Sequence, residues 1–283
     1  MTAYFVYDVF TDRAFGGNQL AVIPDATGLA EDQLQRIACE FNFSETTFVY
    51  PPTDPANTAK VRIFTPTMEV PFAGHPTVGT AIALKDEGAT GNITLELGIG
   101  PIPCTYSGNK AAFTVTAPLE RLSTPDPALI AAALDLTAEA IKTTTHAPVQ
   151  ASVGLPFVMV ELQDRAALTQ CQPATDHFRE GAARYPSNLD FAIYAYVRDG
   201  DQIDARMFAP LDNIPEDPAT GSAAAALAAL LTDEAGRAQS LSILQGEDMG
   251  RPSYIMAQTT PADPIPVTIS GAAVRTMQGT LTL

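Results

Sequence analysis

The sequence predicts an α+β protein of two pseudo-symmetric lobes, each with strands wrapped around a central apolar helix. Three observations predict it: an internal repeat, two helices that are apolar on nearly all sides, and many short segments of strand composition. The chain has 283 residues, of which 46% are hydrophobic, so it is long enough for a large core in one domain or in two.

The repeat is the strongest of these observations, because a repeat defines the architecture. Residues 62–84 (RIFTPTMEVPFAGHPTVGTAIAL) resemble residues 206–230 (RMFAPLDNIPEDPATGSAAAALAAL). The R-x-F-x-P segments match at an offset of 206 − 62 = 144, and HPTVGTA matches DPATGSA at 217 − 75 = 142. This alignment predicts that the second half has lost two residues in the intervening loop.

Three helices are predicted from the pattern of apolar residues. Residues 31–40 place Leu34, Ile37 and Ala38 on one face, as in an amphipathic surface helix. Residues 76–84 and 218–231 are apolar on nearly every side, which is typical of buried helices. Each begins with proline, which suits a first helical position, so His75 and Asp217 should lie at or near the N-caps.

Segments rich in β-branched and aromatic residues, bounded by Gly, Pro, Asn or Asp, predict strands. They are residues 61–64, 93–97, 112–116, 157–162, 191–197, 254–258 and 267–270. The proline-bearing stretch 117–129 interrupts this pattern. We therefore expect an N-terminal lobe over 1–118 and a C-terminal lobe over 119–283, with the strand near 275–283 as a candidate to join the first lobe.

Composition limits the classes of partner. The chain has 32 acidic and 16 basic side chains, a net charge of −16, and no basic patch, so neither nucleic acid nor an anionic membrane surface is an expected partner. No apolar run is long enough to span a bilayer, and the N-terminus lacks the pattern of a signal peptide. Cys39, Cys104 and Cys171 form no C-x-x-C pair and are expected to be buried. A cytoplasmic protein is predicted.

Three residues are candidates for chemistry. His75 follows Gly74 at the start of a buried helix, where free N–H groups attract carboxylates, although a solvent-facing capping turn would give the same residues. Asp217 precedes the second helix, whose first turn contains Thr220, Gly221 and Ser222; a simple N-cap would also explain it. Glu45 begins an apolar strand and would suit acid/base work only if it is buried rather than surface-facing.

The repeat favours the functional interpretation, because related halves would bring the two helix N-termini to one interdomain cleft. Sequence signatures of serine hydrolases, zincins, P-loop proteins and Rossmann proteins are missing. The histidines His75, His146 and His177 lie in unrelated contexts, so no metal site is predicted.

Together these motifs resemble the phenazine biosynthesis PhzF family of isomerases, in the right order and over essentially the whole chain. The segments that carry the resemblance are FTDRAFGGNQLAVI, SETTF, FTPTMEVPFAGHPTVGTA, GLPFV, EDPATGSAAAAL and QGEDMGRPS. The resemblance implies the diaminopimelate-epimerase-like fold, with the active site in the cleft between two equivalent lobes. The paired cysteines of the epimerases are missing from the corresponding turns here, which disfavours two-cysteine racemisation.

The resemblance also implies roles for individual residues. Glu45 would be the acid/base that moves a proton between ring carbons of a trans-2,3-dihydro-3-hydroxyanthranilate-type substrate, and His75 and Asp217 would assist it. Residues expected to bind the substrate are Asn18, Ser44, Gly74, Thr220, Gly221 and Ser222.

No metal or organic cofactor is expected. A homodimer is expected, because homodimers are common in the family that the chain resembles. Two alternatives stay open: an epimerase or racemase of an amino-acid-like substrate, and a non-catalytic protein that binds small carboxylates.

Overall fold

The structure is a computed structural model and describes residues 1–187 and 190–282. The chain forms two compact units. Unit 1 contains Met1–Thr114 and the segment that begins at Ile269, and unit 2 contains Val115–Thr268. The lobe boundary expected from the sequence, between residues 118 and 119, lies close to this division, whereas the C-terminal segment of unit 1 begins before residue 275.

Unit 1 consists mainly of strands. Its elements are β1 (Thr2–Val9), β2 (Asn18–Ile23), α1 (Glu31–Phe41), β3 (Glu45–Tyr50), β4 (Ala59–Phe64), β5 (Glu69–Val70), α2 (Gly74–Asp86), β6 (Ile93–Leu97), β7 (Gly100–Ser107), most of β8 (Lys110–Thr116) and most of β17 (Pro266–Leu281).

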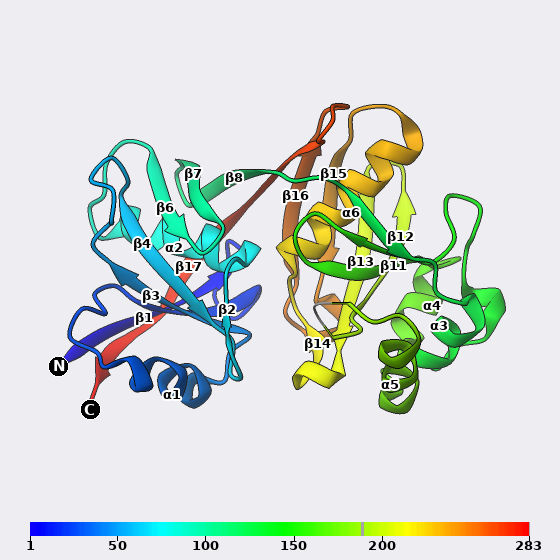
Figure 1. Ribbon diagram of the computed structural model, residues 1–283, viewed down its shortest axis with the longest axis horizontal. Helices are drawn as coiled ribbons and strands as arrows, with labels where there is room; N and C mark the ends of the chain where they lie inside the picture. The colour runs from blue at the N-terminus through cyan, green and yellow to red at the C-terminus, as the bar shows by residue number, and fades with distance from the viewer. Residues whose placement is uncertain (188–189, 283) are drawn as a thin grey trace. The chain divides into compact units, whose positions relative to one another are not determined.

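The strands of unit 1 form a closed ring around α2 (Figure 1). From β17 the pairing runs through β1, β2, β3, β4, β6, β7 and β8, and β8 pairs again with β17. The pairs β2–β3 and β4–β6 are parallel. Helix α2 packs on strands from both sides of this ring, and every residue from Gly74 to Ala83 is buried. The predicted central apolar helix is confirmed.

Two contacts explain how α2 fits inside the ring. Gly79 faces β1 and β2 so closely that a Cβ atom there would lie 2.5 Å from Leu20 Cδ2 and 2.7 Å from Val9 Cγ2. Glycine is therefore needed where the helix crosses these strands. Thr80 donates a hydrogen bond from its hydroxyl to Thr47 Oγ1 of β3, at 3.1 Å. The face of β3 that carries Thr47 thus points toward α2.

Helix α1 covers the outside of the ring. Its buried residues, Leu34, Ile37 and Ala38, are those predicted from the sequence, and they pack with Phe48 and Phe64. Cys39 follows Ala38 by about 100° around the helix and is exposed, so the expectation that it is buried was wrong. Cys104 and Cys171 are buried, as expected.

Unit 2 repeats the order of unit 1 and adds helices. Its elements are β9 (Glu120–Ser123), α3 (Pro127–Ala133), η1 (Ala138–Ala140), β10 (Val149–Ser152), β11 (Pro156–Glu161), α4 (Arg165–Gln170), α5 (Thr175–Arg184), β12 (Ile193–Asp199), β13 (Gln202–Ala209), η2 (Pro210–Asp212), β14 (Ile214–Asp217), α6 (Gly221–Ala235), β15 (Ser240–Gln245), η3 (Glu247–Met249) and β16 (Ser253–Thr259).

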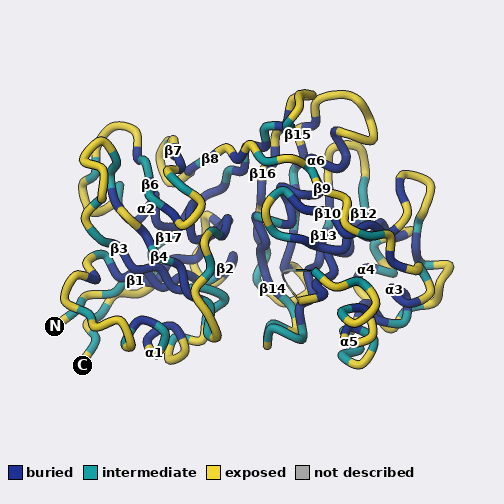
Figure 2. Tube along the Cα trace, viewed as in Figure 1, coloured by how far each residue is buried: buried dark blue, intermediate teal, exposed yellow. Residues whose placement is uncertain are grey.

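Six strand pairings of unit 2 repeat, in order and direction, six pairings of unit 1. The pairs β10–β11, β12–β13, β13–β14 and β15–β16 are antiparallel, and β11–β12 and β13–β15 are parallel. Helix α6 packs against β10, β11 and β16 and is buried from Gly221 to Thr232 except at Ser222. Figure 2 shows both α2 and α6 largely in the colour of buried residues. The predicted fold class is confirmed.

The repeated R-x-F motif has the same structural role in each unit. Arg62 of β4 pairs with Glu69 of β5 at 2.6 Å and lies 5.1 Å from the centroid of the Phe64 ring. Arg206 of β13 pairs with Glu216 of β14 at 2.8 Å and lies 4.8 Å from the centroid of the Phe208 ring. In both units the arginine therefore ties a long strand to the short strand that leads into the central helix.

Beyond this motif, the alignment of the two halves was wrong. The residue pair Ile63–Val70 in unit 1 corresponds to Met207–Asp217 in unit 2, so the offset rises from 207 − 63 = 144 to 217 − 70 = 147. The second half has gained three residues between these strands instead of losing two. The helix starts agree, since Gly74 and Gly221 are also 147 apart. His75 therefore corresponds to Ser222, and Asp217 corresponds to Val70.

Candidate active site

The predicted catalytic and substrate-binding residues form two groups. One group lies in unit 1 and the other in unit 2. The unit 1 site contains Glu45 and His75, with Asn18, Ser44 and Gly74 around them. The unit 2 site contains Asp217, Thr220, Gly221 and Ser222.

Glu45 is placed by the parallel pairing of β2 and β3. It is the first residue of β3 and lies opposite Leu20 of β2. Side chains alternate along a strand, so Glu45 shares the face of Thr47, which points toward α2. Its side chain is only 17% exposed, so it is not the surface-facing glutamate that the sequence left open. Ser44, just before it, is half-buried.

His75 lies in the first turn of α2. The helix begins at Gly74 with Ala73 as N-cap, so His75 is the second helical residue. The helix therefore begins two residues before Pro76, the predicted first residue. Its Nδ1 atom lies 3.3 Å from Glu45 Oε2, and its side chain is 4% exposed. Its Nε2 atom has no hydrogen-bond partner among the residues that the structure describes.

Burial determines the charge of His75. Desolvation lowers the pKa of the imidazole from 6.5 to about 3, and a hydrogen bond with the Gln19 backbone opposes the shift only in part. The imidazole is therefore neutral at pH 7. A neutral imidazole beside a carboxylate can donate a hydrogen bond to charge that develops on a ligand.

Asn18 belongs to β2, the strand that pairs with β3 beside Glu45. It is the first residue of β2, two positions before Leu20, and it is 1% exposed. The preceding Gly17 has φ = 61°, and a Cβ atom there would lie 2.3 Å from Val9 O. A glycine is therefore required for the turn that places Asn18 at the beginning of β2.

In unit 2, Asp217 ends β14 and is not an N-cap. The N-cap of α6 is Thr220, and the helix begins at Gly221, three residues later than predicted. A network of hydrogen bonds surrounds Thr220. Its hydroxyl donates to Asp217 Oδ2 at 2.5 Å, and its N–H donates to Gln245 Oε1 at 3.1 Å.

Two residues of this site were missed in the sequence. Gln245 is fully buried and donates from Nε2 to Asp217 O at 2.8 Å and to Thr220 Oγ1 at 3.0 Å. It belongs to the QGEDMGRPS motif, which was the only signal for it. Tyr194 is also fully buried, and its hydroxyl has no hydrogen-bond partner within the described residues. Burial, together with the charge of Asp217, raises the pKa of Tyr194 above its ordinary value.

The helix N-termini add donors to each site. By helix geometry, the first N–H groups of α2 and α6 have no acceptor within the helix, and the positive ends of the dipoles lie at Gly74 and Gly221. Ser222, which corresponds to His75, is half-buried in the first turn of α6. Within residues 1–187 and 190–282, no group of three or more His, Cys, Asp or Glu side chains is arranged to hold a metal ion.

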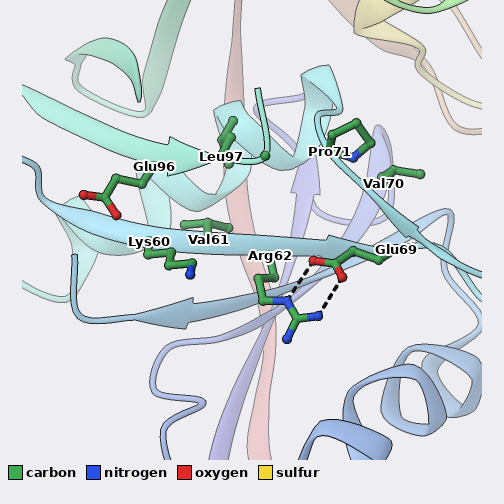
Figure 3. Close-up of a pocket in the computed structure, with 9 residues that line it drawn as sticks. Lys60, Val61, Arg62, Glu69, Val70, Pro71, Glu96 and Leu97 are labelled. Carbon is green, nitrogen blue, oxygen red and sulfur yellow. Dashed lines mark hydrogen bonds and ion pairs between the residues drawn. The ribbon is translucent and has the colours of Figure 1, made fainter. Parts of the chain in front are cut away.

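A separate groove of about 550 Å³ lies on unit 1, lined by β4, β5 and the turn after β6 (Figure 3). Arg62 and Glu69, which form an ion pair, are among its lining residues. Glu45 and His75 are not among its lining residues, so the groove is distinct from the acid/base pair.

Comparison with known proteins identifies the family. The family model described as phenazine biosynthesis-like protein matches residues 7–279. The chain belongs to this family. An uncharacterized isomerase of Mesorhizobium japonicum is 39% identical over 272 residues, covering 91% of this chain and 90% of that protein.

Further relatives agree with this PhzF-type assignment. The trans-2,3-dihydro-3-hydroxyanthranilate isomerase of Pseudomonas aeruginosa is 36% identical over 266 residues, covering 91% of this chain and 90% of that protein. The crystal structure of a PhzF-family protein of Bacillus anthracis has the same fold, with a TM-score of 0.88 at 23% identity, covering 100% of this chain and 99% of that one. The chain is therefore an enzyme of the isomerase class.

Among the described residues, no helix is long and apolar enough to cross a bilayer.

Proposed function

We propose that this isomerase moves a proton between carbons of a small cyclic carboxylate of the trans-2,3-dihydro-3-hydroxyanthranilate type. The observation that carries the proposal is the contact between Glu45 and a buried, neutral His75 at 3.3 Å. The relative from Pseudomonas aeruginosa, named for that substrate, supports the substrate class.

In the proposed mechanism, ionised Glu45 abstracts a proton from a substrate carbon. The negative charge that spreads over the substrate is stabilised by hydrogen bonds from the neutral imidazole and from the N–H groups at the start of α2. Glu45, now protonated, returns the proton to another carbon. The chain's own residues thus supply both the base and the donors that this proton transfer requires.

Asp217, Thr220, Gly221 and Ser222 are assigned a supporting role in the same reaction. We propose that Asp217 assists proton transfer, and that Asn18, Ser44, Gly74, Thr220, Gly221 and Ser222 are substrate-binding residues. With so few lysines in an acidic chain, helix N-termini are the best available source of positive potential for a carboxylate.

Replacing Glu45 with Gln tests the proposal. The amide cannot accept the carbon-bound proton, so turnover should fall by at least about 10³-fold, while the protein stays folded and still binds ligand. The measurement is incorporation of solvent deuterium into trans-2,3-dihydro-3-hydroxyanthranilate, other cyclic carboxylates and amino-acid-like carboxylates. Glu40→Gln, at an exposed position of α1, is the matched control and should retain full activity.

The pattern of labelling decides between the alternatives. Labelling of amino-acid-like compounds alone would favour an epimerase or racemase. Tight binding with no exchange in any compound would favour a binding protein. Substantial activity in the Glu45→Gln variant would remove Glu45 from the mechanism.

A further inference from the structure

The repeated strand pairings allow each position of the unit 2 site to be matched with a position in unit 1. Asp217 lies opposite Met207 in β13, and the corresponding pair in unit 1 is Val70 opposite Ile63. A buried carboxylate in unit 2 therefore stands where unit 1 has an apolar side chain.

The position of Gln245 can be matched in the same way. A glycine packs against the proline before the central helix in each unit, Gly98 on Pro71 and Gly246 on Pro218. A Cβ atom would lie 2.7 Å from the proline Cα at Gly98 and 3.0 Å from it at Gly246. Leu97 and Gln245 directly precede these glycines, so Gln245 corresponds to a leucine.

The N-cap positions complete the set. Ala73 caps α2, and Thr220 caps α6. Unit 1 thus has an apolar set, Val70, Ala73 and Leu97, where unit 2 has the polar set Asp217, Thr220 and Gln245. Figure 3 shows Val70 and Leu97 with Pro71 among the residues that line the groove of unit 1. Burying polar groups costs free energy. Unit 1 forms the same arrangement of strands and helix with apolar side chains at these positions. The polar set is therefore not needed to build the fold.

Within the polar set, Gln245 uses both ends of its amide. Its Nε2 group donates to Asp217 O and to Thr220 Oγ1, and its Oε1 atom accepts from the Thr220 N–H. Because the amide donates to the Thr220 oxygen, the hydroxyl directs its own proton to Asp217 Oδ2. The side-chain carboxylate and the main chain of Asp217 are therefore both held through Gln245.

We infer that Gln245 is a positioning residue of the isomerase, which orients the Asp217 carboxylate through the Thr220 hydroxyl. The inference rests on the proposed function in one respect, the assignment of Asp217 to the reaction. Gln245 itself is not required to touch the substrate.

Replacing Gln245 with Leu, the residue at the matching position of unit 1, is the test. The matched control is Gln239→Leu, because Gln239 is also a buried glutamine of unit 2 and donates to the main-chain oxygens of Leu231 and Arg237. Each variant is compared with the wild type by thermal unfolding and by kcat and KM on a compound that the wild type labels with deuterium.

We expect Gln245→Leu to lower kcat about 10- to 100-fold with KM changed less than about threefold, because a displaced catalytic group affects the transition state most. Gln239→Leu should lose stability but keep kcat within about twofold. Thr220→Val should resemble Gln245→Leu. The double variant should be no slower than the slower single variant, since Gln245 acts on the Asp217 carboxylate through the Thr220 hydroxyl.

Additive losses in the double variant, or an equal loss of kcat in Gln239→Leu, would assign Gln245 a structural role only. A rise in KM alone would also overturn the inference. These results are separate from those on Glu45, because an active Glu45→Gln variant would refute the proposed base without changing the comparison between Gln245 and Gln239.

Discussion

His75 is a titratable group that folding forces into its neutral form. In the unfolded chain its pKa is 6.5, and in the folded chain burial lowers the pKa to about 3. Between these values the unfolded state binds the extra proton, so protonation favours unfolding. The contribution to stability is therefore complete above pH 6.5 and is lost as the pH falls toward 3.

His75→Asn should remove this dependence. We expect the free energy of unfolding of the wild type, relative to the variant, to fall by about 2 kcal/mol between pH 7 and pH 5. Urea unfolding at a series of pH values measures it. Parallel pH profiles for the two proteins in this range would mean that His75 takes up its proton in the folded state.

Arg206 and Arg62 occupy matching positions, but their neighbouring elements differ. The Nη1 atom of Arg206 donates to the main-chain oxygens of Leu168, Thr169 and Cys171 at the end of α4, and its side chain is 7% exposed. Arg62 instead binds Glu31 at the start of α1 and is 22% exposed. Arginine therefore fixes a helix end in both units, from within the core in unit 2 and near the surface in unit 1.

Lysine cannot replace the forked guanidinium at a buried site. We expect Arg206→Lys to lower the free energy of unfolding by about 2–4 kcal/mol, because buried carbonyl oxygens and Glu216 lose donors. Arg62→Lys should cost about 1 kcal/mol or less. The urea midpoints of the two variants provide the comparison, and equal costs would show that the end of α4 does not depend on Arg206.

At the scale of elements, the ring of strands determines how α2 can open. Strands surround this helix, whereas α1 covers the outside of the ring and buries one face only. The amides of α2 should exchange hydrogen only when unit 1 unfolds, and those of α1 should exchange sooner through local opening. Hydrogen exchange with mass spectrometry can separate the two helices; equal rates for them would mean that the ring opens without unfolding.

The elements that could be predicted from the sequence are those defined by local pattern. The face of α1 with Leu34 and Ile37, the two apolar helices and the R-x-F repeat each follow from residues that are close in sequence. The hydrogen bonds of Thr220 could not be predicted, because its partner Gln245 lies in β15. The three-residue gain before Asp217 has a short local signal, because EVPFAG (69–74) matches EDPATG (216–221) at an offset of 147. Strand pairing decides between this alignment and the alignment of HPTVGTA with DPATGSA.

At the scale of the whole molecule, the repeat could be predicted from the sequence. The contacts that distinguish the candidate residues of unit 1 from those of unit 2 could not. The sequence identified Glu45, His75 and Asp217 as candidates, and their pairing with residues distant in sequence decides what each can do. The burial of Glu45 depends on the ring around α2, and the network at Asp217 depends on a strand that follows it by more than twenty residues. A composition or motif cannot report such contacts.

The first and last strands give the chain a mechanical property. Thr2 pairs with Leu281, and the antiparallel ladder of β1 and β17 continues to Val9 and Ala273. Tension between the two ends of the chain would load this ladder at its first rung and open the hydrogen bonds one after another, as in a zipper. Resistance to pulling from the ends should therefore be low, even though the same ladder closes the ring that buries α2.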